Sequence, residues 1–221
     1  MTVTINSSDL KHAQAKFGGV AGDKPTGVFD RVYNEGNITI NQNAKPSVVF
    51  GGVAGWLTGS IEVTDAKNSG NLALNTKEST DKHWCGGVFG YMDSNVKISG
   101  CVNEGAVSVN VNKTNSQCFI GGVLGNANAA GKTFTNCENS GQLTFNLPET
   151  TQTGFFYLDG LVGTNTGHTY VNCKNTGDIN YEGVGKIRLG GLVPYTNTSF
   201  AGTVKCNITA KCTGKDFSEV G

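Results

Sequence analysis

The chain has 221 residues, enough for one or two globular domains with an ample core, but it is unusually rich in glycine, with 32 Gly and only 15% charged residues. The 17 basic and 17 acidic residues cancel, which removes the electrostatic reason to expect nucleic acid or an anionic membrane as the main partner. No run of apolar residues reaches the length of a spanning helix, so we expect no transmembrane segment.

Residues 1–16 contain no basic segment followed by an apolar segment, so they do not have the pattern of a signal peptide. Their first residues, MTVTIN, are similar to the later segment NITIN at 37–41. We therefore interpret residues 1–16 as a partial copy of the unit that follows. The only helical turn that we expect in the chain lies within Ser8–Lys16.

From residue 17 onward, one unit recurs about every 35 residues, with boundaries near 17–49, 50–84, 85–119, 120–157, 158–188 and 189–221. Each unit opens on a glycine pair or, once, Asp-Gly; the second glycines are Gly19, Gly52, Gly87, Gly122, Gly160 and Gly191. An Asn-x-Gly motif follows in the first five units, at Asn34, Asn68, Asn103, Asn139 and Asn175. Because both landmarks keep the same period, the repeat is secure, and residues 1–221 form a single repeat domain.

Each unit contains three predicted strands, since its apolar residues alternate with a period of two. The first enters the glycine pair, with inward positions such as Phe17, Phe50 and Cys85. The second precedes Asn-x-Gly and contributes Phe29, Val63 and the residues equivalent to them. The third follows Asn-x-Gly and reads NITIN (37–41), NLALN (71–75), AVSVN (106–110), QLTFN (142–146) and DINYE (178–182).

Equivalent residues recurring unit after unit predict an all-β fold, a parallel β-solenoid of about six turns that pair in register. We expect right-handed crossovers. The glycines are expected at corners with positive φ, and the motif asparagines at corners where they stack into amide ladders and tolerate left-handed backbone.

Two units carry a recognisable motif. Asp159-Gly160-Leu161-Val162-Gly163 is followed by Asn172-Cys173 and Gly177, and Gly121-Gly122-Val123-Leu124-Gly125 by Asn136-Cys137 and Gly141. These units resemble the GLUG-type glycine-rich repeats of bacterial surface proteins, which occur in adhesin- and protease-associated regions. The units here differ in length from that family, and Val32 and Ala66 stand where cysteine would be in the first two. The resemblance implies a β-solenoid in a surface setting, and it brings no catalytic residue or ligand.

The cysteines form the most regular chemical pattern in the sequence. Cys101, Cys137 and Cys173 each stand two residues before a motif asparagine, and we expect a column of buried thiols that act as small apolar side chains. His83, Cys85 and Cys118 come close together in the predicted stack, but zinc needs a fourth ligand that the sequence does not offer. We therefore expect no metal and no cofactor.

The leading functional hypothesis is a structural or adhesive module of a secreted or cell-surface protein, acting as a stalk or a binding surface. Loops after each glycine motif, at 23–27, 56–60, 91–95, 126–131 and 164–168, form its expected contact surface, with Trp56, Tyr91 and Asn126 positioned to meet carbohydrate or another surface protein. One alternative is a fibre subunit that associates end to end. Another is a polysaccharide-binding or polysaccharide-cleaving protein; catalysis is disfavoured because the aspartates do not converge, so we assign no catalytic residue.

Overall fold

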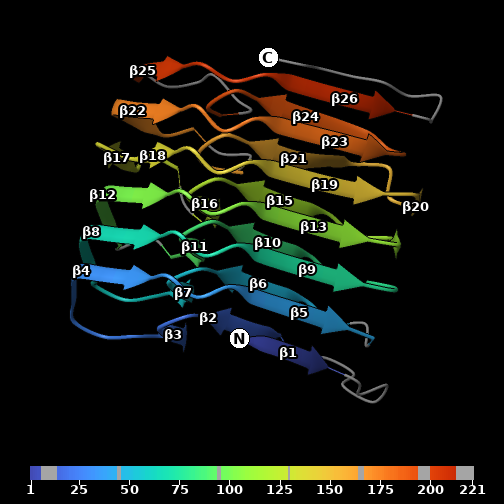
Figure 1. The fold of residues 1–221 in the computed structure, drawn as a ribbon, viewed down its shortest axis with the longest axis horizontal. Helices are drawn as coiled ribbons and strands as arrows, with labels where there is room; N and C mark the ends of the chain where they lie inside the picture. The colour runs from blue at the N-terminus through green and yellow to red at the C-terminus, as the bar shows by residue number, and fades with distance from the viewer. Residues whose placement is uncertain are drawn as a thin grey trace.

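The computed structural model describes residues 1–5, 14–43, 46–93, 96–128, 130–163, 167–193 and 200–212. Within these ranges every regular element is a β-strand, and every strand pairing is parallel. The turns lie one above another from the N-terminus at the bottom of Figure 1 to the C-terminus at the top. The predicted β-solenoid is therefore confirmed, with about five complete turns and partial turns at both ends.

Four stacked sheets make up the turn, in the chain order B, C, D, A. Sheet B contains β2 (Ala15–Gly18), β6 (Val48–Gly51), β10 (His83–Gly86), β15 (Cys118–Gly121), β21 (Phe155–Asp159) and β24 (Lys186–Gly190). Sheet C contains β3 (Ala21–Asp23), β7 (Ala54–Leu57), β11 (Phe89–Met92) and β16 (Leu124–Ala127).

Sheets D and A follow each glycine motif. Sheet D contains β4 (Val28–Asn34), β8 (Glu62–Asn68), β12 (Lys97–Asn103), β17 (Thr133–Thr135) with β18 (Glu138–Asn139), β22 (Thr169–Asn175) and β25 (Phe200–Val204). Sheet A contains β1 (Thr2–Ile5), β5 (Ile38–Gln42), β9 (Leu72–Thr76), β13 (Val107–Val111), β19 (Leu143–Leu147), β23 (Ile179–Gly183) and β26 (Ile208–Cys212). A short sheet joins β14 (Lys113–Thr114) to β20 (Glu149–Thr150).

The register between turns is the predicted one. The Val53 N–H donates to the carbonyl of Val88 at 2.9 Å, and the Val88 N–H to that of Val123 at 3.0 Å. β1 pairs with β5, as the likeness between MTVTIN and NITIN predicts. The expected helical turn in Ser8–Lys16 is wrong at its end, because Ala15 and Lys16 lie in β2; residues 8–13 are outside the described ranges.

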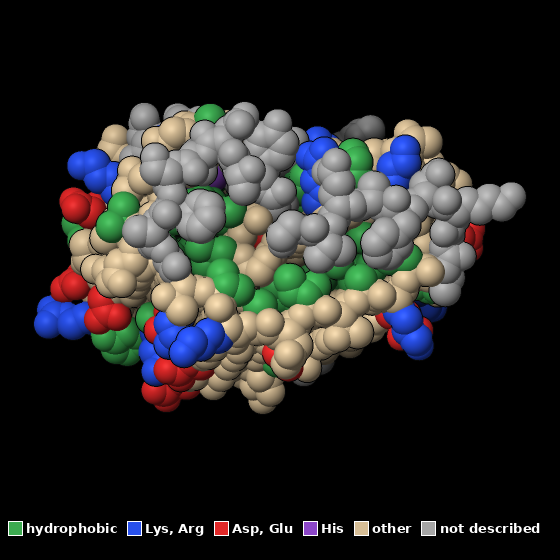
Figure 2. Space-filling view, turned by 90° about the horizontal axis from the view of Figure 1, so that it is seen from above, with side chains coloured by type: hydrophobic (Ala, Val, Ile, Leu, Met, Phe, Trp, Pro, Cys, Tyr) green, Lys and Arg blue, Asp and Glu red, His purple; other side chains and the backbone are tan. Residues whose placement is uncertain are grey.

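Two separate hydrophobic cores run along the stack. Sheets A and B enclose one, which includes Ile40, Phe50 and Phe145. Sheets C and D enclose the other, which includes Phe89 and Phe134. Seen along the stack, hydrophobic side chains form a band across the molecule, bordered by polar side chains and backbone (Figure 2). The strands run along the longest dimension in Figure 1, so the described stack is a flattened slab and not a slender rod.

The two sequence landmarks meet between these cores. The motif asparagines from Asn34 to Asn139 each donate from Nδ2 to Oδ1 of the next one up, as in Asn68 to Asn103 at 2.8 Å and Asn103 to Asn139 at 2.7 Å, so the predicted ladder is confirmed. The second glycine of each of the first five motifs lies against this ladder: a Cβ on Gly87 would come within 2.3 Å of the Asn103 Cγ atom. The pair glycine is therefore required for close approach.

The expectation that the paired glycines and motif asparagines adopt positive φ is wrong. Among the described non-glycine residues, positive φ occurs at Lys24 and, one residue before the cysteine column, at Arg31, Asp65, Asn136 and Asn172; Gly100 is the glycine of that same column. The backbone turns at this position of sheet D, and asparagine and glycine adopt that conformation most readily. In the last turn, the sequence offers both Cys206 and Cys212 for the cysteine column. The structure places neither there, because Gly202 is paired with Cys173.

Candidate functional site

The predicted contact residues form a column on sheet C. Trp56 pairs with Tyr91, and Tyr91 with Asn126, in adjacent strands. The sequence predicted that these residues lie in loops, and this prediction is wrong. They lie in strands, because β7, β11 and β16 follow directly after the glycine motif. The segments 94–95, 129 and 164–166 of the predicted loops are outside the described residues.

Sheet B adds an aromatic residue that the sequence did not single out. Trp84 lies with its ring centroid 5.3 Å from that of Tyr91, and the Trp56 and Tyr91 centroids are 4.4 Å apart. Trp56 and Trp84 are half-buried, whereas Tyr91 is 8% exposed. We call these three residues the aromatic strip. It forms because the glycine corner brings the outer faces of sheets B and C toward each other.

Polar groups surround the aromatic strip. The Lys16 ammonium lies 4.2 Å from the Trp56 ring centroid and 2.8 Å from a carboxylate oxygen of Asp23. The Trp56 indole N–H donates to Asp93 at 3.3 Å. The indole nitrogen of Trp84 is buried and has no hydrogen-bond partner among the described residues. The strip thus offers partly exposed rings with an ammonium group and carboxylates beside them, which suits a ligand that is both apolar and polar.

The cysteine column has the predicted location. Cys101, Cys137 and Cys173 are all buried and unlinked. The hydrogen bond with the neighbouring Cys101 thiol and the desolvation on burial raise the pKa of Cys137, although the hydrogen bond with Cys173 opposes this rise. A raised pKa disfavours the thiolate, the form that attacks electrophiles and binds metals.

His83 and Cys118 are paired in adjacent strands, as predicted. The His83 Nδ1 atom accepts a hydrogen bond from the Val48 N–H at 3.1 Å, and burial lowers the pKa of His83 to about 4. Among the described residues, no group of three or more His, Cys, Asp or Glu side chains is arranged to hold a metal ion.

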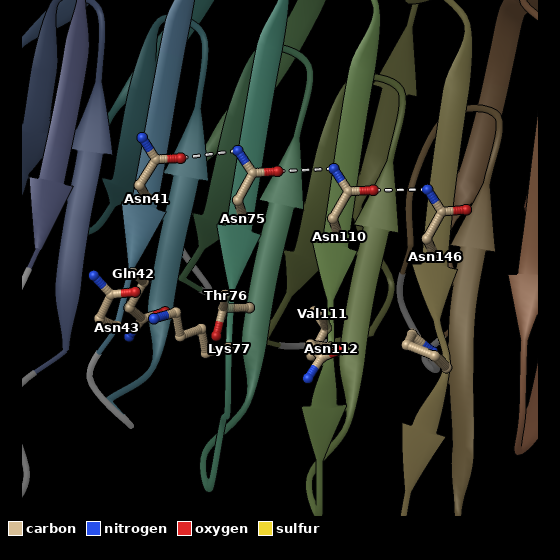
Figure 3. A pocket seen from close by; sticks show the side chains of 11 residues that line it. Asn41, Gln42, Asn43, Asn75, Thr76, Lys77, Asn110, Val111, Asn112 and Asn146 are labelled. Atoms are coloured by element: carbon tan, nitrogen blue, oxygen red, sulfur yellow. Dashed lines mark hydrogen bonds between the residues drawn. The ribbon is translucent and has the colours of Figure 1, made fainter.

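A second surface lies on the outer face of sheet A. Asn41, Asn75, Asn110 and Asn146, the last residues of the four repeats NITIN, NLALN, AVSVN and QLTFN, form another hydrogen-bonded ladder (Figure 3). The Nδ2 atoms of the upper three donate to Oδ1 of the asparagine one turn below, at 2.7 to 2.9 Å. All four side chains are half-buried.

This second ladder, which we call the outer ladder, forms one wall of a groove of about 380 Å³. Further lining comes from the ends of the same strands and the residues after them: Gln42, Asn43, Thr76, Lys77, Val111, Asn112 and Pro148. We call this site the asparagine groove. Lys77 is the one charged residue of its lining, so the groove is close to neutral.

Gln42 is the unusual residue of the asparagine groove. Its side chain is only 1% exposed, and its Nε2 donates to the Pro46 carbonyl. Its Oε1 atom is buried without a hydrogen-bond donor from the described residues. Thr76 and Val111 occupy the same column in the next two turns. A buried acceptor left without a donor costs about 1–3 kcal/mol.

Sequence reasoning missed the asparagine groove, although a signal was present. Asparagine ends four successive copies of the segment predicted as the third strand, at Asn41, Asn75, Asn110 and Asn146. Such residues at a strand end are ordinarily interpreted as turn formers. These asparagines differ from turn formers because each stands at the same distance from the inward apolar residues of its own strand.

Comparisons with known proteins found no match: no family model, no curated protein and no solved structure is similar to this chain. Across the described part of the chain, no helix has the length and apolar character needed to span a membrane.

Proposed function

We propose that this chain is a repeat module of a secreted or cell-surface protein and that it serves as an adhesive surface. The aromatic strip carries the proposal, because its rings come from two sheets and are held in place by the stacking of turns. The resemblance to GLUG-type surface repeats supports the setting. A slab with repeated faces is suited to many weak contacts at once, which together bind much more tightly than one.

The proposal predicts that adhesion requires many copies of the chain on one surface. Beads coated with the chain are passed over surfaces coated with carbohydrate, and the force needed to release them is measured. Coated beads should be retained at chain densities where the free chain binds weakly, since linked weak contacts gain 10²- to 10⁴-fold in avidity. The double variant Trp56→Ser, Trp84→Ser should lose most of the retention. Thr144→Ala, on the outer face of sheet A, is the control. Equal retention of the wild type and the double variant would rule the proposal out.

A second candidate is end-to-end self-association. Among the described strands, β1 and β26 lie at the ends of sheet A and each has one neighbour. An open edge of this kind is a template for a strand of another chain. Sedimentation velocity over a wide concentration range tests this candidate, and a chain that stays monomeric throughout excludes it.

A further inference from the structure

We propose that Asp159 makes the fifth turn of the stack sensitive to pH: its carboxyl group packs only in the neutral form, and its ionisation opens the corner between sheets B and C. The effect concerns one corner of the solenoid and is independent of the adhesive function proposed above. It follows from the place of Asp159 in the turn, from the burial of its unpaired carboxyl group, and from the end of sheet C beside it.

Asp159 stands at a corner where the other turns have glycine. It pairs with Gly121 in the turn below and with Gly190 in the turn above. The same place is held in the first three turns by Gly18, Gly51 and Gly86. A side chain does not fit there, because a Cβ on Gly121 would lie 2.1 Å from the Leu124 carbonyl oxygen. The fifth turn therefore cannot bring sheets B and C together as closely as the turns below it.

The carboxyl group of Asp159 is buried without a partner. The residue is 0% exposed, and neither carboxyl oxygen accepts a hydrogen bond from a described residue. Desolvation raises the pKa of Asp159 well above its ordinary value, although the nearby Gly190 backbone opposes this rise. A buried charge without a counter-ion is much more costly than a buried neutral carboxyl group, so Asp159 stays protonated while the corner is closed.

Sheet D supplies no counter-ion for Asp159 from its described residues. Tyr170 of β22 is close, and burial together with the Asp159 carboxylate raises the pKa of Tyr170 well above its ordinary value. Cys173 of the same strand is kept as a neutral thiol, because its hydrogen bond with the neighbouring thiol and its burial raise its pKa. Lys174, the cation of β22, forms an ion pair with Glu138 at 2.7 Å.

Sheet B supplies no counter-ion from its described residues either. Lys186 and Arg188 of β24 pair with other residues of β21, and the Arg188 guanidinium lies 4.1 Å from the Phe155 ring centroid. Cys118, the titratable residue of β15, lies in the core between sheets A and B. Ionisation of Asp159 would therefore leave an uncompensated charge in the interior, and this cost is relieved only when the corner opens and water reaches the carboxylate.

Sheet C ends beside Asp159. Its strands belong to the first four turns, and the last of them is β16. In the fifth turn, the described part of the segment after Asp159 forms only a bridge between Val162 and Leu124. Fewer ladder contacts therefore hold this segment than hold β7, β11 or β16, and this corner should open before the corners of the lower turns.

The direction of the pH dependence follows from which state holds the proton. The closed corner keeps Asp159 protonated, whereas the open corner lets it ionise with the ordinary aspartate pKa of about 3.9. The corner is therefore most stable below this pH, and its stability is lost as the pH rises toward the pKa of the closed state. Over that range, each pH unit makes opening about tenfold easier.

Amide hydrogen exchange of the full ¹⁵N-labelled chain between pH 5 and pH 8 tests the proposal. The reporter is the Leu161 N–H, which donates to the Leu192 carbonyl at 2.8 Å. The equivalent Val53 N–H, which donates to the Val88 carbonyl at 2.9 Å, is the internal control. The protection factor of Leu161 divided by that of Val53 should fall by up to about tenfold per pH unit. Dividing the two factors cancels pH effects that act on the whole stack.

Two variants identify the group responsible. Asp159→Asn keeps the size of the side chain but cannot ionise, so the ratio should stay constant with pH. Asp159→Gly restores the residue of the other turns, so it should raise the protection of Leu161 and also give a constant ratio; it keeps the test decisive if the asparagine variant does not fold. A constant ratio in the wild type would overturn the proposal. A ratio that still falls with pH in either variant would overturn it too, because another group would then control the opening.

Discussion

The buried asparagine ladder is expected to contribute a large part of the stability, and Asn103 is the residue at which to test it. Its Nδ2 donates to the Gly105 carbonyl at 2.8 Å and to the Asn139 Oδ1 at 2.7 Å, and its Oδ1 accepts from Asn68 at 2.8 Å. Asn103→Ala removes three hydrogen bonds of about 1 kcal/mol each and leaves a buried acceptor on Asn139 without its donor. We expect a loss of about 3–5 kcal/mol in the free energy of unfolding, out of a total that is commonly 5–15 kcal/mol.

Asn34→Ala is the matched control for this experiment. Asn34 begins the ladder, is half-buried, and donates only to Gly36 and Asn68 in the described structure, so its loss should be about 1–2 kcal/mol. Urea unfolding followed by tryptophan fluorescence and by far-ultraviolet circular dichroism measures both values, and coincident transitions establish that a single free energy applies. Asn103→Ala no more destabilising than Asn34→Ala would refute the idea that the buried ladder stabilises the stack.

Three other predictions follow from single positions. His83 has a pKa of about 4 when folded and about 6.5 when unfolded, so the unfolded state binds more protons between these values. The free energy of unfolding should therefore fall by about 3 kcal/mol as the pH drops from 6.5 to 4. His83→Gln should flatten this dependence of stability on pH in urea titrations, and equal slopes for the variant and the wild type would count against the assignment. Arg31→Gly should stabilise and Gly100→Ala should destabilise the chain by about 0.5–1 kcal/mol each, because both positions have positive φ; shifts of the melting temperature in the same direction would contradict this. Of the seven thiols, only the partly exposed Cys206 and Cys212 should react quickly with a thiol reagent in the native protein, and the other five only after denaturation, so rapid labelling of all seven would exclude the buried column.

The stacking of turns could be predicted from the sequence because it depends on local alternation and on a constant repeat. Ile38, Leu72 and Val107 hold equivalent places in successive units, and the structure pairs them in adjacent strands of sheet A. A parallel register that aligns like with like buries every apolar column at once, whereas a shift by one residue would expose it. The buried asparagine ladder could be predicted on the same grounds.

Sheet C could not be predicted in this way. Its strands are four residues or shorter, and a segment such as Ala54–Leu57 includes a glycine and shows no clean alternation. Its residues become a strand because the glycine corner carries the chain back against sheet B, where Gly55 comes close to the backbone of Phe17. The aromatic strip depends on this fold-back, and Trp84 joins it from the other sheet.

The sequence by itself determined the repeat, the all-β solenoid and the inward columns, because these follow from the spacing of residues along the chain. Only the tertiary structure decided that the turn encloses two cores, that the glycine pairs serve close approach to the ladder, and that a groove with Gln42 lies beside the outer asparagines. The physical reason is that these features depend on contacts between segments on different sides of a turn. A local sequence pattern does not show which of these segments contact each other.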